Sequence, residues 1–317
     1  MKKESAIKKT RGTVISVARA VFLLAFSFVL LYPVFFMVSN SVKTGSDLLN
    51  PAVEWLSKSP SLYSYKIAYE AMNFPKSFLI TVRFELVSAI ISVFSCALYA
   101  YGLSRFDFKL KPLILFMVIL IIFVPDIILI IPRVTNFRYT DLFGILGLVK
   151  KITGTDLRPN LMDTELTFYL PSLFGVGLKG GLFIFIYMQF FKGLPKELEE
   201  AAWVDGAGPF KTFFKIILPS SGVVILTVLI FSVIWHWNDW LLSMMYTNSN
   251  KTLAVLVYSI DDAVGRWSAE NAVTLKTELK YGIPLAACLI YITPPTVMYL
   301  FLQKKFIQSI DRVGIVG

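Results

Sequence analysis

Long apolar runs, separated by polar and charged stretches, dominate the chain. A run of about 18 or more apolar residues matches the thickness of the hydrocarbon core of a bilayer, so each such run predicts a membrane-spanning helix. None of the runs alternates between apolar and polar residues as the strands of a membrane barrel do. We expect an all-α, integral membrane helical bundle. Its six spans are predicted at residues 20–39, within 77–103, and at 112–132, 170–191, 220–246 and 282–303.

The composition agrees with a membrane protein. Hydrophobic residues make up 56% of the 317 residues and charged residues only 16%, and the mean hydropathy is +0.67. Soluble domains carry about a quarter charged residues. The net charge of +10 could indicate a nucleic acid partner, but basic residues that flank membrane spans explain it better, so lipid and not nucleic acid is the expected partner. The first apolar run is too long for a signal peptide and is followed by no small-residue cleavage site, so we expect it to be retained.

The distribution of Lys and Arg orients the predicted spans. If the N-terminus is cytoplasmic, the inside stretches hold 15 Lys and Arg in 66 residues, whereas the outside stretches hold 13 in 108. This bias predicts that both termini are cytoplasmic. The chain then divides into a basic cytoplasmic segment at 1–19, a six-span domain at 20–303 and a cytoplasmic tail at 304–317. The outer connections are long and mixed in charge, so we expect folded caps rather than linkers.

A polar stretch at residues 193–219, between the fourth and fifth predicted spans, has the pattern of two short helices joined by a turn. Pro195 suits the first turn of a helix. Three glutamates follow it at 197, 199 and 200, where the helix dipole favours carboxylates. Gly206 stands where a C-terminal cap is expected, and Pro209 opens the second helix.

The second short helix is predicted to be amphipathic. Phe210, Phe213, Phe214 and Ile217 recur at the spacing of one helical face. Such a face needs a groove on another protein or a membrane surface to cover it. A helix lying on lipid would explain the phenylalanines, but not the Glu-Ala-Ala and Asp-Gly-Ala sequences that precede them.

The same stretch carries a resemblance to a known family. Its residues match every fixed position of the EAA motif of ABC-type importer permeases, namely Glu200-Ala201-Ala202, Gly206, Ile216 and Leu218-Pro219. Other segments resemble the sugar-importer branch, the maltose-type inner-membrane permeases: Tyr101-Gly102-Leu103-Ser104-Arg105-Phe106, Pro125, Pro132 and Trp237-Asn238-Asp239. The resemblance covers residues 80–317, with the first span matched loosely. The connection 133–169 is longer than is usual in the family.

The resemblance implies that the loop at 193–219 docks as a coupling helix on a cytoplasmic ATPase dimer and transmits its motion to the spans. Alanines at 201 and 202 would permit close approach, Glu200 would offer a charged anchor, and Gly206 would permit the turn. The resemblance assigns to this coupling Glu200, Ala201, Ala202, Asp205, Gly206, Ala207, Ile216, Leu218 and Pro219. It also implies a second homologous permease and an extracytoplasmic solute-binding protein as partners. ATP and magnesium would bind the ATPase, and this chain would hold no cofactor.

Ionisable residues at membrane depth are candidates for function. Asp126, after Pro125 in the third predicted span, is expected either to line the substrate pathway or to satisfy backbone groups that the proline frees. Lys179 lies in a glycine-rich stretch, where it could face a pathway and attract an acidic sugar, or extend to the outer surface. Arg83 and Glu85 are expected at the outer interface, without a functional role.

The sequence Trp235-His236-Trp237-Asn238-Asp239-Trp240 supports more than one interpretation. Aromatic rings next to hydrogen-bonding groups suit sugars, so Trp237, Asn238 and Asp239 are candidates for the substrate pathway. Tryptophan at the end of a span is also typical of the aromatic belt at a membrane interface.

The residues give little support for catalysis or metal binding. His236 is the only histidine, which leaves no histidine-based metal site or triad within the chain. Cys96 and Cys288 both lie in apolar spans, so neither a disulfide nor a metal framework is expected. The chain contains no G-x-x-x-x-G-K-[ST] phosphate loop. We therefore expect a transport subunit without catalytic residues of its own.

We expect a multi-pass protein of the cell membrane, the permease subunit of an ABC importer for sugars or oligosaccharides. Two alternatives remain open at this stage. The same subunit could carry a peptide, an amino acid or an ion. A secondary transporter would instead show paired broken helices and buried carboxylates in repeated halves, for which Asp126 alone is thin support.

Overall fold

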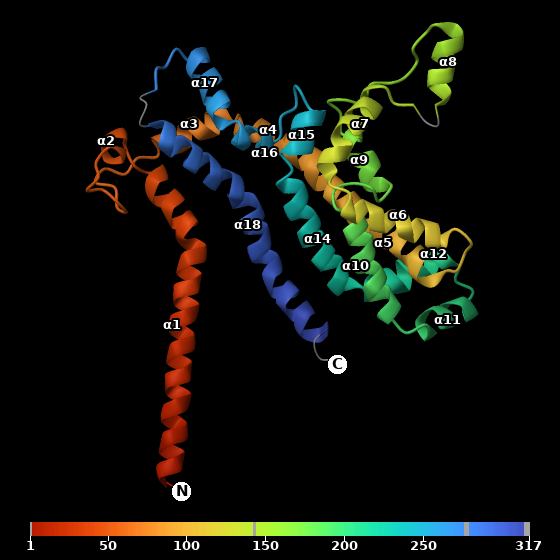
Figure 1. The fold of residues 1–317 in the computed structure, drawn as a ribbon, viewed down its shortest axis with the longest axis horizontal. Coiled ribbons are helices and arrows are strands. Elements are labelled where there is room, and N and C mark those ends of the chain that lie inside the picture. Colours follow the sequence, from red (N-terminus) through yellow and green to blue (C-terminus); the bar gives the residue numbers. More distant parts are fainter. Residues whose placement is uncertain (1, 142–143, 276–278, 314–317) are drawn as a thin grey trace. The chain divides into compact units, whose positions relative to one another are not determined.

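The computed structural model describes residues 2–141, 144–275 and 279–313, and every regular element within these ranges is a helix (Figure 1). The chain forms two compact units. The first comprises Met1–Ala71 with Ile260–Ile290, and the second comprises Met72–Ser259 with Tyr291–Gly317. The helical fold class predicted from the apolar runs is confirmed for the described residues.

The first unit contains the long N-terminal helix and three short helices. These are α1 (Lys2–Ser41), α2 (Gly45–Leu48), α3 (Tyr63–Ala71) and α17 (Ile260–Glu270), together with the first part of α18 (Leu279–Val313). Helix α3 packs against α17. The start of α18 approaches closely at Gly282, where a Cβ atom would lie 2.9 Å from the Ser64 hydroxyl and 3.4 Å from the Asn40 carbonyl oxygen. These contacts hold the unit together around the C-terminal end of α1.

The second unit contains most of the helices. In chain order they are α4 (Phe74–Thr81), the π-helical turn η1 (Val82–Leu86), α5 (Val87–Arg105), α6 (Lys111–Phe123), α7 (Asp126–Arg138), α8 (Ile145–Thr153), α9 (Leu166–Leu173), α10 (Gly180–Gly193), α11 (Glu197–Val204), α12 (Pro209–Thr212), the π-helical turn η2 (Phe213–Ile217), α13 (Leu218–Ser220), α14 (Gly222–Trp237), α15 (Leu241–Tyr246) and α16 (Leu253–Tyr258). The predicted outer connections therefore contain folded helices, as expected.

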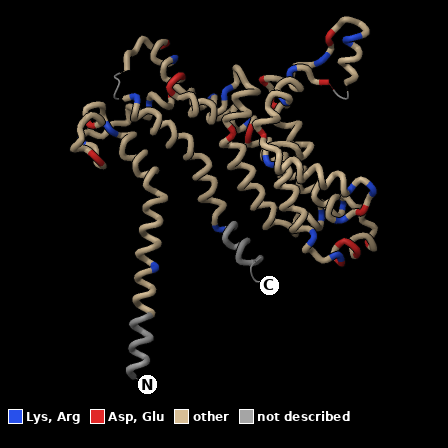
Figure 2. The backbone as a smooth tube through the Cα atoms, viewed as in Figure 1, with Lys and Arg blue, Asp and Glu red and all other residues tan. Residues whose placement is uncertain are grey.

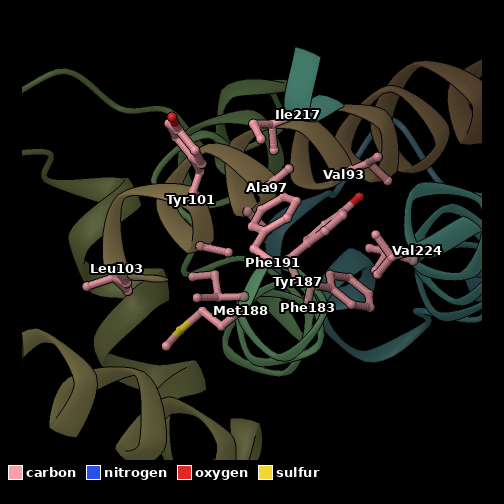
Figure 3. Packing of buried hydrophobic residues seen from close by; sticks show 14 of the residues in the cluster. Val93, Ala97, Tyr101, Leu103, Phe183, Tyr187, Met188, Phe191, Ile217 and Val224 are labelled. Atoms are coloured by element: carbon pink, nitrogen blue, oxygen red, sulfur yellow. The ribbon is translucent and has the colours of Figure 1, made fainter. Parts of the chain in front are cut away.

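Helix α5 is the centre of the second unit. It packs against α9, α10 and α14, and α10 also packs against α6. The core lies where small residues of α5, such as Ala97 and Ala100, meet large aromatic residues of α10, such as Phe183 and Tyr187 (Figure 3). Small residues let the helix backbones approach closely, which is how apolar helices gain packing energy in a membrane. This core positions both groups of candidate residues considered below.

Among the described residues, three helices are long and apolar enough to cross a membrane: Gly12–Ser41 of α1, the continuous helix Phe74–Arg105, and Leu279–Lys304 of α18. Two bent pairs raise the number to five if each counts as one span. These are α6 with α7, bent by 108°, and Pro209–Ser220 with α14, bent by 82°. Helix α14 contains no Lys, Arg, Asp or Glu (Figure 2), which is why it counts as part of a possible membrane span.

The remaining predicted span, at 170–191, is not one continuous helix. It is divided between α9 and α10 by residues 174–179, where Gly175 and Lys179 adopt the left-handed conformation at φ +69° and +59°. Gly180 follows directly, and a Cβ atom there would lie 2.3 Å from the Gly175 carbonyl oxygen. The glycine-rich stretch that made a strong helix unlikely by sequence is therefore a tight, non-helical turn.

The close approach of α10 to α6 generates a stability prediction. A Cβ atom at Gly181 would lie 3.0 Å from the Val118 carbonyl oxygen and 3.1 Å from the side chains of Ile121 and Ile122. Gly181→Val should therefore force the helices apart and cost about 1–3 kcal/mol of unfolding free energy. The effect is measured as a lowered midpoint of thermal unfolding in detergent. Gly222→Val, where a Cβ atom meets nothing within 4 Å, is the matched control, and equal midpoints for the two variants would contradict this packing.

Candidate functional site

The loop at 193–219 folds as α11, a tight turn, and the short continuous run of α12, η2 and α13. The turn is closed by Gly206 at φ +75°. Its N–H donates to the Trp203 carbonyl oxygen at 3.0 Å, and the Ala207 N–H donates to the Ala202 carbonyl oxygen at 2.9 Å. This pattern ends a helix with a left-handed residue, a position that favours glycine. The prediction that Gly206 caps the first helix is confirmed, as is the prediction that Pro209 opens the second.

One side of the loop is built into the core of the second unit. Phe213 and Ile217 are fully buried, and both belong to the same hydrophobic core as Val93 and Ala97 of α5 (Figure 3). The Phe213 ring centroid lies 5.1 Å from that of Tyr101. Burying a side chain of this size contributes roughly 1.5–3 kcal/mol. The loop is therefore fixed to α5 by apolar packing and is not a separate flexible segment.

The prediction of one apolar face on the second short helix was wrong. Phe213 and Ile217 point into the core, whereas Phe210 is 69% exposed and Phe214 is 54% exposed. The π-helical turn η2 begins at Phe213 and changes the register of the side chains. As a result, the phenylalanines are divided between the core of the chain and its surface.

A buried ion pair provides a second attachment of the loop. Arg105, the last residue of α5, places its Nε atom 3.2 Å from Oε1 of Glu199 in α11, and both side chains are about 95% buried. The Arg105 Nη2 atom also donates to the Leu194 carbonyl oxygen at 2.8 Å. Burial raises the pKa of Glu199 above its ordinary value, and the guanidinium of Arg105 acts in the opposite direction. The sequence analysis assigned no role to either side chain in this pairing.

The outward side of the loop carries most residues of the predicted coupling motif. Its exposed members are Glu200, Ala201, Asp205, Gly206 and Pro219, whereas Ala207, Ile216 and Leu218 are half-buried. Ala202 is buried against the chain itself, so only Ala201 leaves a small side chain on the surface. Next to it lie exposed Trp203 and Val204. The loop thus presents exposed apolar side chains and a mixed charge, with Lys196, Lys211 and Lys215 exposed as well as its acidic residues.

A second group of candidates meets in the second unit, where several helices are interrupted, partly at its surface. Asp126 is the first residue of α7, directly after the bend from α6. Its Oδ1 atom accepts a hydrogen bond from Arg133 at 3.3 Å, and its Oδ2 atom lies 3.6 Å from Nζ of Lys179. Lys179 is the left-handed residue before α10. The structure therefore brings Asp126 and Lys179 together as an ion pair.

Two further carboxyl groups lie in the same region. Glu85, in the π-helical turn η1, is fully buried, and its Oε1 atom accepts a hydrogen bond from the Ser243 hydroxyl. Asp239 follows α14, is also buried, and accepts a hydrogen bond from the Leu242 N–H at 3.1 Å. The depth of Glu85 in the membrane stays a prediction, but its side chain is not at a surface of the chain, because α4, η1 and α5 form one continuous helix that places it against α14 and α15. Its neighbour Arg83 is exposed and pairs with Glu165.

The other members of the tryptophan-rich segment have structural contacts. The Trp237 Nε1 atom donates to the Tyr291 carbonyl oxygen at 3.3 Å, and the Tyr291 hydroxyl donates to the Trp237 carbonyl oxygen at 2.7 Å. Asn238 is exposed and bonds the Ile234 carbonyl oxygen at 2.8 Å. His236 is buried and its Nδ1 atom donates to the Ser232 carbonyl oxygen at 2.9 Å. Among the residues of the segment 235–240, Asp239 is the one that lies close to the carboxyl groups of Glu85 and Asp126.

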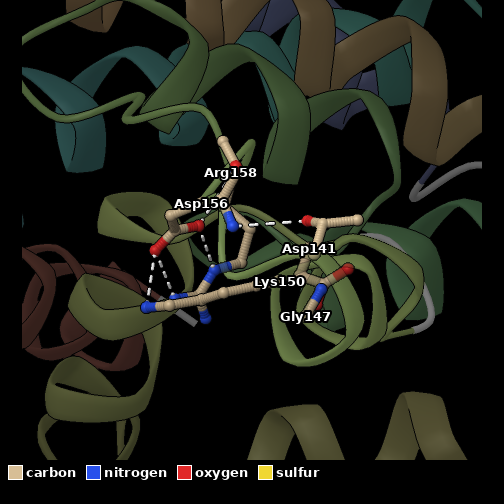
Figure 4. Close-up of polar contacts among 7 residues, drawn as sticks. Asp141, Gly147, Lys150, Asp156 and Arg158 are labelled. Carbon is tan, nitrogen blue, oxygen red and sulfur yellow. Dashed lines mark hydrogen bonds and ion pairs between the residues drawn. The ribbon is translucent and has the colours of Figure 1, made fainter.

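The long connection at 133–169 is ordered by its own polar contacts (Figure 4). Asp141 accepts hydrogen bonds from the N–H groups of Leu146 and Gly147 at the start of α8, at 2.9 and 2.7 Å. Asp156 bonds both Lys150 and Arg158, which hold its pKa well below the usual range. The connection therefore forms a folded projection with its own helix.

Within the described ranges, no group of three or more His, Cys, Asp and Glu side chains is placed to hold a metal ion. Cys96 and Cys288 are both free. The structure contains two other candidate sites. One is the polar loop, which is attached to the core, and the other is the group of charged residues where the helices are interrupted.

Comparison with known proteins assigns the chain to a family. The model of the family described as "binding-protein-dependent transport system inner membrane component" matches residues 92–312. This range contains the loop at 193–219, Asp126, Lys179 and Asp239, and leaves Glu85 outside.

Individual relatives match along most of the chain. The probable starch degradation products transport system permease protein AmyC of Thermoanaerobacterium thermosulfurigenes is 26% identical over 281 residues, which cover 88% of this chain and 89% of that protein. The diacetylchitobiose uptake system permease protein NgcG of Streptomyces coelicolor is 26% identical, with 92% and 85% covered. A chain in the crystal structure of a bacterial ABC transporter that imports the acidic polysaccharide alginate has the same fold, with a TM-score of 0.67 at 18% identity and 92% and 96% covered.

The buried ion pair generates a prediction about the loop. Arg105→Met leaves Glu199 buried without its partner and should lower the free energy of unfolding by about 3–5 kcal/mol. Arg105→Met combined with Glu199→Met removes both charges and should recover most of that loss. Thermal unfolding and limited proteolysis of the loop in detergent measure both effects. A double variant as unstable as the single one would show that the pair does not act as argued.

Proposed function

The chain belongs to the family of binding-protein-dependent transport system inner membrane components, and we propose that it is the transmembrane permease subunit of an ATP-driven ABC importer for carbohydrates. Members of this family are permease subunits of transporters and not enzymes in their own right. The chain is a multi-pass protein of the cell membrane. A carbohydrate cargo is supported by the relatives, which are named for starch degradation products and diacetylchitobiose.

We propose six spans with both termini cytoplasmic. The five spans or bent pairs that qualify by length and composition leave α9 and α10 as the remaining crossing, which would be discontinuous in the same way as α6 and α7. Non-helical backbone at membrane depth is tolerated where protein or a water-filled cavity surrounds it. The excess of Lys and Arg in the inner stretches supports the orientation.

The observation that carries the proposal is the double attachment of the loop at 193–219. Phe213 and Ile217 are packed into the core, and Arg105 pairs with Glu199 beneath the loop. A loop fixed in this way cannot bend independently of α5 and α10, so a displacement of the loop must displace these helices. Its exposed side, with Glu200, remains available to a partner.

The partners of this importer follow from the same proposal. A cytoplasmic ATPase dimer would contact the exposed side of the loop, and ATP with magnesium would bind there and not in this chain. A second homologous permease would supply the other half of the pathway, and the most apolar part of α1, which is not buried within this chain, would be available to it or to lipid. An extracytoplasmic solute-binding protein would deliver the sugar to the outer connections.

We place the substrate pathway of this chain at the interrupted helices. Asp126, Lys179 and Asp239 come from three separate elements and meet there. Trp237 and Asn238 remain neighbours of this region, but their hydrogen bonds to α18 and α14 give them a supporting role. Ionisable side chains at membrane depth mark transport pathways more often than structural sites.

The coupling role makes a specific prediction for two exposed positions. Glu200→Ala removes the proposed anchor, and Gly206→Pro is incompatible with φ +75° and removes the hydrogen bond to Trp203. Both variants should insert normally and form the assembly, yet sugar uptake should fall by at least about tenfold, equivalent to about 1.4 kcal/mol of lost coupling. Uptake is measured with the complete importer in proteoliposomes.

Gly208→Pro is the matched control, because Gly208 in the same loop has φ −75°, which proline adopts without strain. It should retain uptake close to that of the wild type. Normal uptake by a well-expressed Gly206→Pro variant would remove the basis for the coupling role of this loop.

A further inference from the structure

Helix α8 lies on a projection of the second unit, defined here as residues 139–141 and 144–163. It stands apart from the other helices of this unit (Figure 1). None of its nine residues is buried. Three of its apolar side chains are largely exposed, with Ile145 and Leu148 at 59% and Ile152 at 75%. Exposed apolar side chains gathered on one helix indicate a surface that another molecule covers.

The residues of α8 divide into an apolar and a basic side. At 3.6 residues per turn, each residue is rotated by about 100° from the one before it. Ile145, Leu148 and Ile152 therefore share one face, called here the apolar face. Lys150 and Lys151 lie on either side of this face, away from its centre. This distribution is typical of a helix that lies in the plane of a membrane interface.

Polar contacts fix α8 within the projection (Figure 4). The Asp141 carboxylate accepts hydrogen bonds from two N–H groups at the start of α8, at 2.9 and 2.7 Å. Lys150 and Arg158 both pair with Asp156, at 2.8 and 2.7 Å. Lys151 is exposed and makes no ion pair with any residue that the structure describes. The projection thus presents the apolar face in a fixed orientation, with one unpaired cation beside it.

The base of the projection is attached at the end of a possible membrane span. The Leu161 N–H donates to the Phe137 carbonyl oxygen, and the Asp163 N–H donates to the Tyr246 carbonyl oxygen, both at 2.8 Å. The ring centroids of Phe137 and Tyr246 lie 5.1 Å apart. Tyr246 ends α15, which follows the uncharged helix α14. Because a span ends at the bilayer surface, this surface lies near the base of the projection.

We propose that α8 lies in the membrane interface, with its apolar face among the lipid acyl chains and Lys151 extended to a lipid phosphate. The apolar face consists of aliphatic side chains, which suit lipid, whereas protein interfaces are enriched in aromatic residues and arginine. A lysine at the border of such a face can reach the phosphates while its stem stays in apolar surroundings. This inference goes beyond the proposed function and is independent of the cargo, because it requires only that the chain spans a membrane.

Nitroxide labels on the assembled importer in phosphatidylcholine nanodiscs test this placement. One variant carries the label at Ile152→Cys, on the apolar face, and the matched control carries it at Lys151→Cys. Power saturation compares the collisions of each label with oxygen, which concentrates in the bilayer, and with a water-soluble nickel chelate. Insertion of three such side chains should favour the lipid-bound position at least about tenfold over the solvated one. The ratio of oxygen to nickel collisions should therefore be higher at Ile152→Cys, and equal ratios would overturn the proposal.

The same labels distinguish lipid from a protein partner. In lipid, Ile152→Cys should be accessible to oxygen and inaccessible to the nickel chelate, both with and without the solute-binding protein. Protection from the chelate only after the binding protein is added would overturn the proposal and assign the apolar face to that protein. Protection from both oxygen and the chelate in the importer alone would assign it to a protein subunit, and would overturn the proposal equally.

A charge on the apolar face examines the physical cause. With the label at Leu148→Cys, Ile152→Asp should lower the ratio of oxygen to nickel collisions, because a carboxylate is costly to place among acyl chains. Thr155→Asp, at an exposed position after α8, is the matched control and should leave the ratio unchanged. Equal ratios in the two variants would contradict insertion. Sugar uptake is a separate measurement, so an assembly that moves no sugar counts against the importer and leaves the placement of α8 intact.

Discussion

The ion pair between Arg105 and Glu199 is the contact on which the account of this chain depends. It joins the last residue of α5 to the first turn of α11, and both charged groups are removed from solvent. A buried ion pair is costly to break, because either charge alone would remain desolvated. Together with the burial of Phe213 and Ile217, it makes the loop at 193–219 an extension of the helical core.

The attachment of the loop also explains how it is connected to the charged residues at the interrupted helices. Helix α5 contacts the loop at one end and belongs, through η1 and α4, to the continuous helix that places Glu85 in the interior. Helix α10 continues directly into the loop, shares the hydrophobic core with it through Phe191, and begins directly after Lys179. Both helices that hold the loop thus also carry, or directly adjoin, a charged residue at the interrupted helices, Glu85 or Lys179. Motion of the loop is therefore expected to be coupled, through α5 and α10, to rearrangement of the charged residues at the interrupted helices.

The pattern of apolar residues was sufficient to predict the fold class and the places of most spans, because burial in a membrane requires long apolar runs. The end of α11 at Gly206 and the start of α12 at Pro209 were also predictable, because glycine and proline have backbone preferences that do not depend on tertiary structure. The sequence could not show that α9 and α10 are separate, although the glycines around Lys179 indicated a weak helix.

The errors came from properties that depend on tertiary structure. The π-helical turn η2 changes the register after Thr212, so that Phe213 and Ile217 are buried while Phe210 and Phe214 are exposed, and nothing in a 3.6-residue period indicates such a turn. The burial of Glu85 was missed because it sits near the start of an apolar run, whereas the helix begins earlier, at Phe74. The pairing of Arg105 with Glu199 spans 94 positions of the chain and had no local signal beyond the family-like segment that contains Arg105.

Distance measurement between spin labels tests the central claim most directly. One label replaces Val204, which is 87% exposed in the loop, and the other replaces Phe94, which is 49% exposed on α5. The assembled importer is examined by pulsed electron resonance without nucleotide and with ATP trapped. We predict that this distance and its distribution do not change between the two states, because the loop and α5 move as one rigid body. A shifted or broadened distribution with ATP would contradict the account, since the loop would then move independently of the helix that it is proposed to drive.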